Sequence, residues 1–434
     1  MRIKSIGFGR FGKLRNFKLK LEKPKVSLFN QASVHIIVGE NGTGKTSILK
    51  FISDTFYKRI SYHNGTDFSI EYDLSAEKDN IISNEEYPAH LPKKIIISTY
   101  SPFEQFEARK LKNDFSNVEY CYVGAMSKSP YGSTTSLSSV CMPILTAFYH
   151  PVDKKSEAIK ELLNEIGVTT SPLVEIRPKS LLMNRDYYED NGIAQELVEK
   201  IYNFPNESDF GVRRRGRNLV VPPHIIDQYY VGGWEQWLND VRQLLQFKRS
   251  ISPIQSLWFE RSEDSEPIPM NKLSSGELSL FFRFFRMLEV MDDDAIVLID
   301  EPEIHLHPRW ILKYLWMIKK VFGQYSSHFI IATHSPLIAS DLPREYIVGL
   351  KDDNGVIKQY FVDENTMGAG PTEILREVFR LEKYIGKFTL DYIKRINNLI
   401  DDNKISEARR LYNELGDSQE KYKLFLRLER LENK

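Results

Sequence analysis

Residues near the N-terminus have the types and the spacing that bind phosphate. Gly39–Thr46 reads GENGTGKT, which fits the pattern G-x-x-x-x-G-K-[ST], and it lies between a predicted strand and a predicted helix. Glycines let the backbone curl until its N–H groups face an anion, and the helix N-terminus adds about half a positive charge. Lys45 is then placed to reach the β- and γ-phosphates of ATP, and Thr46 to ligate Mg²⁺. The candidate nucleotide-binding residues are Gly39, Glu40, Asn41, Gly42, Thr43, Gly44, Lys45, Thr46 and Ser47.

A strand-like run far along the chain ends in two acids. Ala295–Glu301 reads AIVLIDE, so its carboxylates follow a buried apolar strand. Ligands of open α/β sheets bind at the carboxyl ends of the strands. We expect Asp300 to hold Mg²⁺ through water. We expect Glu301 to be the general base for the attacking water, a role that accelerates a reaction about 10²–10⁴-fold. Together with the phosphate-binding loop, this pair indicates ATP hydrolysis.

The segment LSSGE, Leu273–Glu277, has two interpretations. Ser274 and Glu277 fit a helix capping box, S-x-x-E. The segment also resembles the signature motif of the ABC ATPase superfamily, and its place in the chain favours that interpretation. The resemblance implies that Ser274, Ser275, Gly276 and Glu277 contact the γ-phosphate held by a second copy, so that two heads sandwich ATP. Ser274 would supply the contact, and Gly276 would allow close approach.

Histidines after the two acids divide into two groups. His334 follows the predicted strand Phe329–Ala332 and resembles the switch histidine of ABC ATPases, which touches the γ-phosphate. His305 and His307 could suggest a metal site, but no acidic or cysteine set completes one. Their segment, EPEIHLHP, resembles the loop that runs along the dimer seam in that superfamily. The predicted catalytic residues are therefore Glu301 and His334.

The pattern of apolar residues predicts an α/β fold. Strands alternate with helices on either side of a long middle segment, which implies a mostly parallel core sheet. Alternating residues in the first 38 positions predict an antiparallel β subdomain. We divide the chain into 1–106, the N-terminal part of an ABC-type ATPase head with the phosphate-binding loop; 107–265, a mostly helical insertion; 266–365, the rest of the head; and 366–434, a helical C-terminal region.

Composition excludes several classes of protein. The 59 basic and 59 acidic residues give zero net charge, and apolar residues make up 41%, as in ordinary globular domains. Two cysteines, Cys121 and Cys141, imply no disulfide framework, which fits a cytoplasmic protein. No run reaches the roughly 18 apolar residues that a membrane span needs, and no leader is indicated. We therefore expect no contact with a membrane.

Several motifs together narrow the resemblance. IDEPEIHLHP is typical of the branch of ABC-type, AAA-family ATPases that includes OLD, RecF and SMC proteins. STYSPFEQF at 98–106, YCYVG at 120–124 and HFIIATHSPLI at 328–338 look like PtuA, the ATPase family of Septu and some retron anti-phage systems. That resemblance implies ATP and Mg²⁺ as cofactors, an HNH nuclease of the PtuB type as partner, and assembly beyond a dimer. It also implies a Mg²⁺-sensing residue, either Glu104 or Gln105.

Other functions remain open at this point. The alternatives are the ATPase of another defence system, such as AriA of PARIS, a RecF-like DNA-repair ATPase, and a scaffold with vestigial turnover. The residues after His334 predict helices rather than the acidic strands of a Toprim nuclease, and no H-N-H constellation is present, so we expect no nuclease activity. The basic cluster Arg213, Arg214, Arg215 and Arg217 is the best candidate contact for DNA or RNA, or else a solvated loop.

Overall fold

The computed structural model describes most of the chain and divides it into two compact units. Unit 1 is Met1–Ala369 and unit 2 is Gly370–Lys434. The described residues are 1–58, 67–84, 88–100, 106, 117–124, 137–149, 153–168, 172–182, 192–203, 213–215, 217–247, 252–259, 266–381 and 385–432. In this part of the chain, no helix has both the length and the hydrophobicity of a membrane span.

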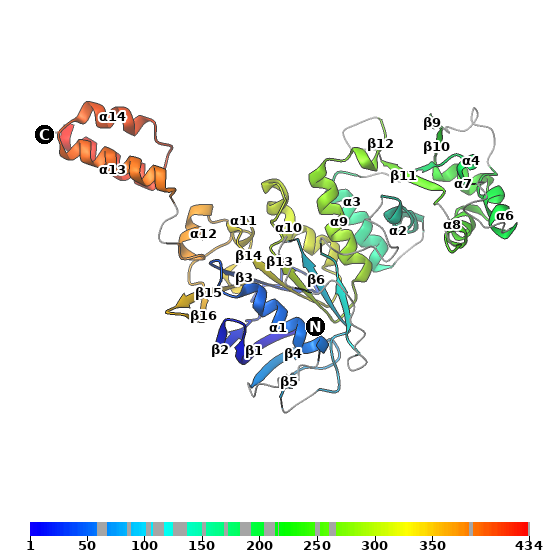
Figure 1. Ribbon diagram of the computed structural model, residues 1–434, viewed down its shortest axis with the longest axis horizontal. Coiled ribbons are helices and arrows are strands. Elements are labelled where there is room, and N and C mark those ends of the chain that lie inside the picture. The colour runs from blue at the N-terminus through cyan, green and yellow to red at the C-terminus, as the bar shows by residue number, and fades with distance from the viewer. Residues whose placement is uncertain are drawn as a thin grey trace. The chain divides into compact units, whose positions relative to one another are not determined.

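A seven-stranded sheet forms the centre of unit 1 (Figure 1). Neighbouring strands are parallel except for β15 and β16, which form an antiparallel pair. The central strands are almost entirely buried because helices or the second sheet cover both faces, and they therefore read as continuous apolar runs. The order is β16 (Val356–Phe361), β15 (Ile347–Asp353), β3 (Ser33–Gly39), β14 (His328–Thr333), β13 (Ala295–Asp300), β6 (Lys94–Thr99) and β7 (Glu119–Tyr122).

An antiparallel sheet of four strands contains the N-terminus, as the alternating pattern predicts. Its order is β2 (Leu14–Lys20), β1 (Arg2–Phe11), β4 (Phe68–Asp73) and β5 (Asn80–Ser83). Helix α1 (Lys45–Lys58) packs between this sheet and the core sheet in one apolar cluster. Phe8 of β1 lies 4.3 Å from Phe51 of α1, measured between ring centroids. The helix that begins at the phosphate-binding loop is thus held from both sides.

Three helices cover the other face of the core sheet. They are α3 (Lys154–Glu165), α9 (Ser275–Val290) and α10 (Pro308–Phe322). Phe322 packs on Phe284 and on Phe329 of β14, with ring centroids 5.7 and 5.5 Å apart. Side chains alternate along a strand, so Phe329 faces these helices while Ile330 joins the cluster around α1.

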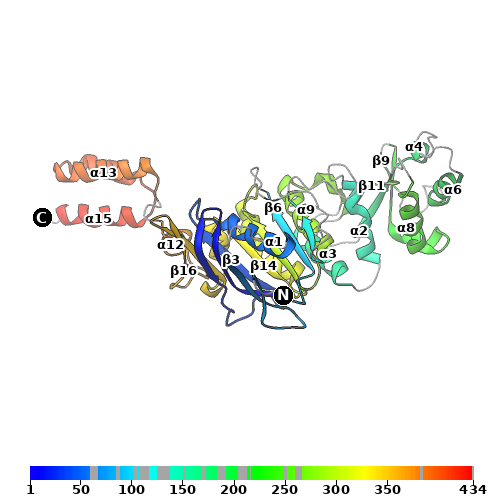
Figure 2. The ribbon, with the colours of Figure 1, turned by 60° about the horizontal axis from the view of Figure 1, so that its bottom comes forward.

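The middle segment contains more β structure than its sequence pattern predicts. The sequence pattern predicts helices over Ser156–Ile166, Ile193–Asn203 and Trp234–Phe247, and they are present as α3, α6 (Gly192–Ile201) and α8 (Gly233–Leu244). Beside them lie α2 (Leu137–Tyr149), α4 (Lys179–Leu182) and α7 (Pro223–Tyr229). They accompany a five-stranded antiparallel sheet in the order β12 (Ile268–Pro269), β11 (Ile254–Phe259), β8 (Leu173–Ile176), β10 (Asn218–Val221) and β9 (Arg213–Arg215). In both views most of this segment lies at the end of unit 1 remote from β16 (Figure 2).

Two elements of the predicted insertion, 107–265, pack with the ATPase head. Strand β7 falls within 107–265 but completes the core sheet, and α3 packs on α9 and α10. Trp234 and Trp237, whose helical spacing predicts core positions, are buried and stacked, with ring centroids 5.3 Å apart.

Among the described residues of unit 2, all regular elements are helices. They are α12 (Pro371–Glu377), α13 (Lys387–Asp401), α14 (Ile405–Asn413) and α15 (Gln419–Glu432). The last three share a small core that contains Ile396, Ala408 and Leu428. Apolar residues at helical spacing predict helices over Phe388–Ile400, Ser406–Leu415 and Gln419–Glu432. Helices α13, α14 and α15 each begin within one residue of these positions.

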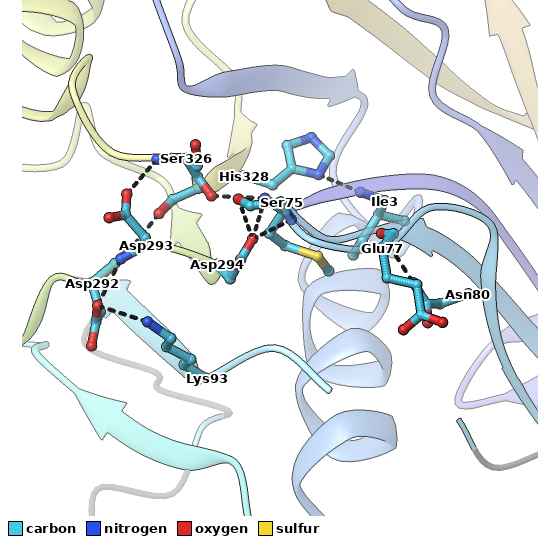
Figure 3. A network of polar contacts seen from close by, with 12 residues as sticks. Ile3, Ser75, Glu77, Asn80, Lys93, Asp292, Asp293, Asp294, Ser326 and His328 are labelled. Atoms are coloured by element: carbon cyan, nitrogen blue, oxygen red, sulfur yellow. Dashed lines mark hydrogen bonds and ion pairs between the residues drawn. The ribbon is translucent and has the colours of Figure 1, made fainter. Parts of the chain in front are cut away.

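Aspartates at the amino end of β13 join the N-terminal four-stranded sheet to the core sheet (Figure 3). Asp294 Oδ1 accepts hydrogen bonds from the Met1 ammonium group at 2.9 Å and from Ser75 Oγ at 2.8 Å. Asp293 Oδ1 accepts one from the main-chain N–H of Ser326 at 2.8 Å. These contacts connect the N-terminal sheet to the core sheet at the edge opposite the carboxyl ends of the parallel strands.

A pair of buried histidines makes a second connection between the sheets. The main-chain N–H of Ile3 can only donate, and it lies 2.9 Å from His328 Nδ1. His328 therefore carries its proton on Nε2, which faces His35 Nδ1 at 2.8 Å. His35 Nε2 donates in turn to the Glu22 carbonyl at 2.7 Å. Both imidazoles are neutral in this chain of hydrogen bonds.

Candidate functional site

The predicted site residues meet at the carboxyl edge of the core sheet. Strand β14 lies between β3 and β13, and all three run in the same direction. The phosphate-binding loop follows β3, the two acids end β13, and His334 follows β14. The topology therefore brings three segments that are distant in sequence to one place.

The phosphate-binding loop has the backbone that its glycines permit. Gly42 and Gly44 have φ of 86° and 84°, in the left-handed region. Lys45 Nζ donates to the carbonyls of Gly39 at 2.8 Å and Glu40 at 3.0 Å. Burial lowers the pKa of Lys45 to about 8, although Glu301 and other nearby carboxylates act against this shift. An anion placed beside this buried ammonium group would therefore favour its charged form.

Thr46 and Asp300 link the two halves of the site. Thr46 Oγ1 donates to the Asp300 carboxylate, 2.9 Å from Oδ2 and 3.1 Å from Oδ1. Burial raises the pKa of Asp300 to about 7, which the Thr46 hydrogen bond partly opposes. A hydroxyl and a buried carboxylate are hard oxygen donors of the kind Mg²⁺ takes. These residues fit a magnesium ion bound with nucleotide.

Glu301 and His334 face one another. His334 Nε2 lies 3.3 Å from Glu301 Oε1. Burial, with a contribution from the positive charge of Lys45, lowers the pKa of His334 to about 4, so the imidazole is neutral near pH 7. Glu301 has φ of 51°, a left-handed conformation that costs a non-glycine residue about 1–2 kcal/mol. Strain of this kind is concentrated at functional sites, and here it aims the carboxylate at the site.

Three residues that surround these acids have no role assigned by the sequence motifs named above. Arg283 of α9 is 2% exposed and donates from its guanidinium to the carbonyls of Pro302 at 2.8 Å and Ile304 at 2.6 Å. The same group lies 3.8 Å from the ring centroid of Tyr100. Glu303 contacts the turn that carries His334. An arginine on the apolar face of α9 was the available signal, because buried charge requires dedicated partners.

The LSSGE segment begins α9 with a complete capping box. The Ser274 main-chain N–H donates to Glu277 Oε2 at 2.7 Å, and the Glu277 N–H donates to Ser274 Oγ at 3.3 Å. A Cβ atom on Gly276 would lie 3.1 Å from Trp310 Nε1, so this glycine allows α9 to approach α10 closely. Ser274 and Ser275 are exposed at the helix N-terminus. The cap and the expected phosphate contact are compatible, because the helix N-terminus favours an anion.

The contacts above do not include the other residues named from the sequence. Glu104 and Gln105 fall outside the described residues. Arg213, Arg214 and Arg215 form β9, and of the cluster's side chains only that of Arg217, which is exposed, is described. His307 caps α10 by accepting a hydrogen bond from the Arg309 N–H at 3.2 Å. No group of three or more His, Cys, Asp and Glu residues in the described part of the chain could hold a metal ion.

Comparisons with known protein families match both halves of the site. One family model, described as "AAA domain, putative AbiEii toxin, Type IV TA system", matches residues 146–341, which include the two acids and His334. A second, described as an AAA domain, matches residues 1–74, which include the phosphate-binding loop. The chain is an AAA-family ATPase. Nucleotide binding follows from that membership.

Curated relatives of this ATPase are distant in sequence. Protein ea59 of Escherichia phage lambda is 22% identical over 364 residues, which cover 82% of this chain but 56% of ea59. The ATPase therefore spans just over half the length of that relative. The Retron Vc95 probable ATPase of Vibrio cholerae serotype O1 biovar El Tor is 22% identical over 84% of this chain and 78% of its own length. Septu protein PtuA of Bacillus thuringiensis is 29% identical over 28% of this chain and 32% of PtuA.

Proposed function

We propose that this ATPase is the nucleotide-driven regulatory subunit of an anti-phage defence complex and controls a partner nuclease of the HNH type. The observation that carries its enzymatic part is the meeting of Thr46 with Asp300 and of Glu301 with His334 at one sheet edge. The defence role is supported by the similarity to PtuA and to the retron ATPase.

Each side chain has a role in the proposed hydrolysis. Lys45 binds the β- and γ-phosphates, with the loop's N–H groups around them. Thr46 and Asp300 would hold Mg²⁺, which offsets phosphate charge when bound. Glu301 accepts a proton from the water that attacks the γ-phosphorus, as the bond from that phosphorus to the bridging oxygen breaks. His334, neutral and in contact with Glu301, orients the base and contacts the γ-phosphate.

The second half of the proposal is a dimer of heads. Ser274 and Ser275 are exposed at the start of a 16-residue helix, where the helix dipole favours an anion. In the proposed dimer, ATP on Lys45 of one chain meets Ser274 of the other. ATP binding then closes the heads, and hydrolysis reopens them. Further copies, as the resemblance to PtuA implies, would assemble on this dimer.

Co-purification from the native operon with ATP and Mg²⁺, followed by mass spectrometry, tests the assembly. An HNH protein at fixed stoichiometry supports the proposal. A Toprim protein instead favours the PARIS-like alternative. A chain that purifies alone as a nucleotide-dependent dimer favours a RecF-like DNA clamp, and DNA-stimulated turnover would then decide. Nucleotide binding without turnover would favour the scaffold.

The arginine cluster is the proposed nucleic-acid contact. Changing Arg213, Arg214, Arg215 and Arg217 to Glu should abolish DNA or RNA binding at low salt, because phosphate contacts dominate such affinity. ATP hydrolysis without nucleic acid should be unchanged. Unaltered binding in an anisotropy titration would remove this cluster from consideration.

A further inference from the structure

A single carboxylate oxygen organises the turn that carries His334. Glu303 Oε1 accepts a hydrogen bond from the main-chain N–H of His334 at 2.6 Å and another from Thr333 Oγ1 at 2.9 Å. Thr333 Oγ1 in turn accepts from the Ser335 N–H at 3.0 Å. Glu303 therefore fixes three consecutive residues of the turn, including the peptide group of His334 itself.

Glu303 is itself held rigidly. The two carbonyls on either side of it, those of Pro302 and Ile304, both accept hydrogen bonds from the buried Arg283. Its own carbonyl accepts from the Leu306 N–H at 3.0 Å. The loop after β13 cannot shift without breaking charge-assisted hydrogen bonds, which are roughly twice as strong as neutral ones. The position of the Glu303 carboxylate is consequently set by α9 and by this loop.

The imidazole of His334 then reaches Glu301. Two acids two residues apart thus contact the same histidine, Glu303 at its main chain and Glu301 at its ring. Glu303 Oε2 is buried and has no hydrogen-bond partner among the described residues. Leaving a buried acceptor without a partner costs stability, about 1–3 kcal/mol. Local cost of this kind is typical of functional sites.

We propose that Glu303 is a positioning residue of the ATPase site, which places His334 beside Glu301. In this proposal, Glu303 acts through the 333–335 turn and not directly on the attacking water or the γ-phosphorus. The inference rests on the proposed roles of Glu301 and His334. Loss of its hydrogen bonds should displace the imidazole and slow the chemical step, with little effect on ATP binding.

Steady-state ATPase kinetics of single and double variants test this role. Glu303→Ala should lower kcat about 10- to 100-fold with KM for ATP changed less than about 3-fold, since a misplaced catalytic group costs rate rather than binding. Glu303→Gln, whose amide oxygen can accept both hydrogen bonds, should keep most of the activity. Thr333→Val, which removes one donor and keeps the side-chain shape, should lower kcat several-fold. Glu303→Ala should add almost nothing to a His334→Ala variant.

Asp293→Ala is the matched control. Asp293 also accepts a main-chain N–H, that of Ser326, but at the opposite edge of the β13–β14 pair. This variant should have a lower melting temperature, and its kcat and KM for ATP should be those of the wild type at a temperature where it is folded. Circular dichroism should show Glu303→Gln and Thr333→Val folded as the wild type, so the proposal stays testable if Glu303→Ala does not fold.

Three results would overturn the proposal. The first is a wild-type kcat in folded Glu303→Ala. The second is an equal fall in kcat in Glu303→Gln and Glu303→Ala. The third is a double variant in which the falls in kcat from Glu303→Ala and His334→Ala multiply. Wild-type kcat in His334→Ala would refute the assigned role of His334, and this inference would fall with it. A lower kcat in His334→Ala together with a wild-type kcat in Glu303→Ala would refute the positioning role alone.

Discussion

Thr46 Oγ1 donates a hydrogen bond to Asp300 Oδ2 at 2.9 Å, although the two residues are 254 positions apart. The contact joins the start of α1 to the end of β13, past the intervening strand β14. The buried parallel strands β3, β14 and β13 lie side by side, so the helix that follows β3 and the acid that ends β13 reach the same edge of the sheet. The hydroxyl and the carboxylate meet there. The two halves of the ATPase site are thereby held together within one chain.

Replacing Glu301 by Gln should stop hydrolysis and retain ATP. The amide cannot accept the proton from the attacking water, so kcat should fall about 10²–10⁴-fold. ATP affinity should remain within a few-fold of the wild type, and the closed, ATP-loaded dimer should accumulate. Turnover assays and size-exclusion chromatography with ATP and Mg²⁺ measure both effects.

The exposed Glu364 offers a control, because Glu364→Gln changes the same charge on unit 1 away from the site. That variant should behave as the wild type. Glu301→Gln that hydrolyses ATP at the wild-type rate would show that another group is the base.

Two glycines of the phosphate-binding loop should differ in their tolerance of alanine. Both have positive φ, so either substitution should destabilise the fold by about 1–2 kcal/mol through backbone strain. A Cβ on Gly44 would also lie 2.9 Å from Cδ2 of the buried Leu14, whereas one on Gly42 would meet nothing within 4 Å. Overpacking a core adds about 1–3 kcal/mol.

Urea unfolding of Gly44→Ala and Gly42→Ala checks this difference. The free energy of unfolding should fall further for Gly44→Ala. Equal losses in the two variants would mean that Leu14 moves aside and that strain alone acts.

The buried histidine pair should make stability depend on pH. Burial lowers the pKa of His35 to about 4 and that of His328 well below its usual value, with Arg2 and, for His328, the Met1 ammonium group acting in the same direction. Both stay neutral in the folded chain, whereas the unfolded chain binds protons below about pH 6.5. The contribution of the histidine pair to the free energy of unfolding is therefore fully present above that pH. It is lost as the pH drops from about 6.5 toward 4. His35 alone accounts for roughly 3 kcal/mol of the loss.

Denaturant unfolding of wild type and His35→Gln between pH 4 and 7.5 measures this contribution. The variant should be less stable at pH 7.5 and should lose less stability on acidification. His224→Gln, at an exposed position, should follow the wild type. Parallel curves for wild type and His35→Gln would mean that the pair does not set the pH dependence.

Sequence patterns predicted the elements that run through the core and missed those that depend on long-range packing. The strands β13 and β14 could be predicted because buried parallel strands are continuous apolar runs bounded by polar turns. Strands β8 and β10 have only four residues each. They pair with one another, and β8 pairs with β11, across more than 40 residues of sequence, which leaves no local signal. Short apolar segments of that length fit helix or strand equally.

The same distinction holds for the site. Lys45, Asp300 and His334 stand at motif positions and could be named from sequence, although their catalytic roles remain predictions. Glu303 could not be named, and Arg283 was marked only by its place on the apolar face of α9, because what matters in each is a contact with a main-chain group on another element. No periodicity or spacing encodes such contacts. They become visible only when α9, the loop after β13 and the turn after β14 are placed together.

Mixing two inactive variants tests the central claim, that ATP is hydrolysed between two heads. Lys45→Ala removes a residue of the chain's own phosphate-binding loop, and Ser274→Arg blocks the surface offered to the other chain. Each variant alone should be inactive. In an equimolar mixture, half of the dimers combine one of each chain and contain one intact site of two. The mixture should therefore regain about a quarter of the wild-type rate if the two sites act independently, since enzymatic rate follows the number of complete sites. A Ser274→Arg chain that hydrolyses ATP at the wild-type rate, or a mixture no more active than its components, would contradict the account.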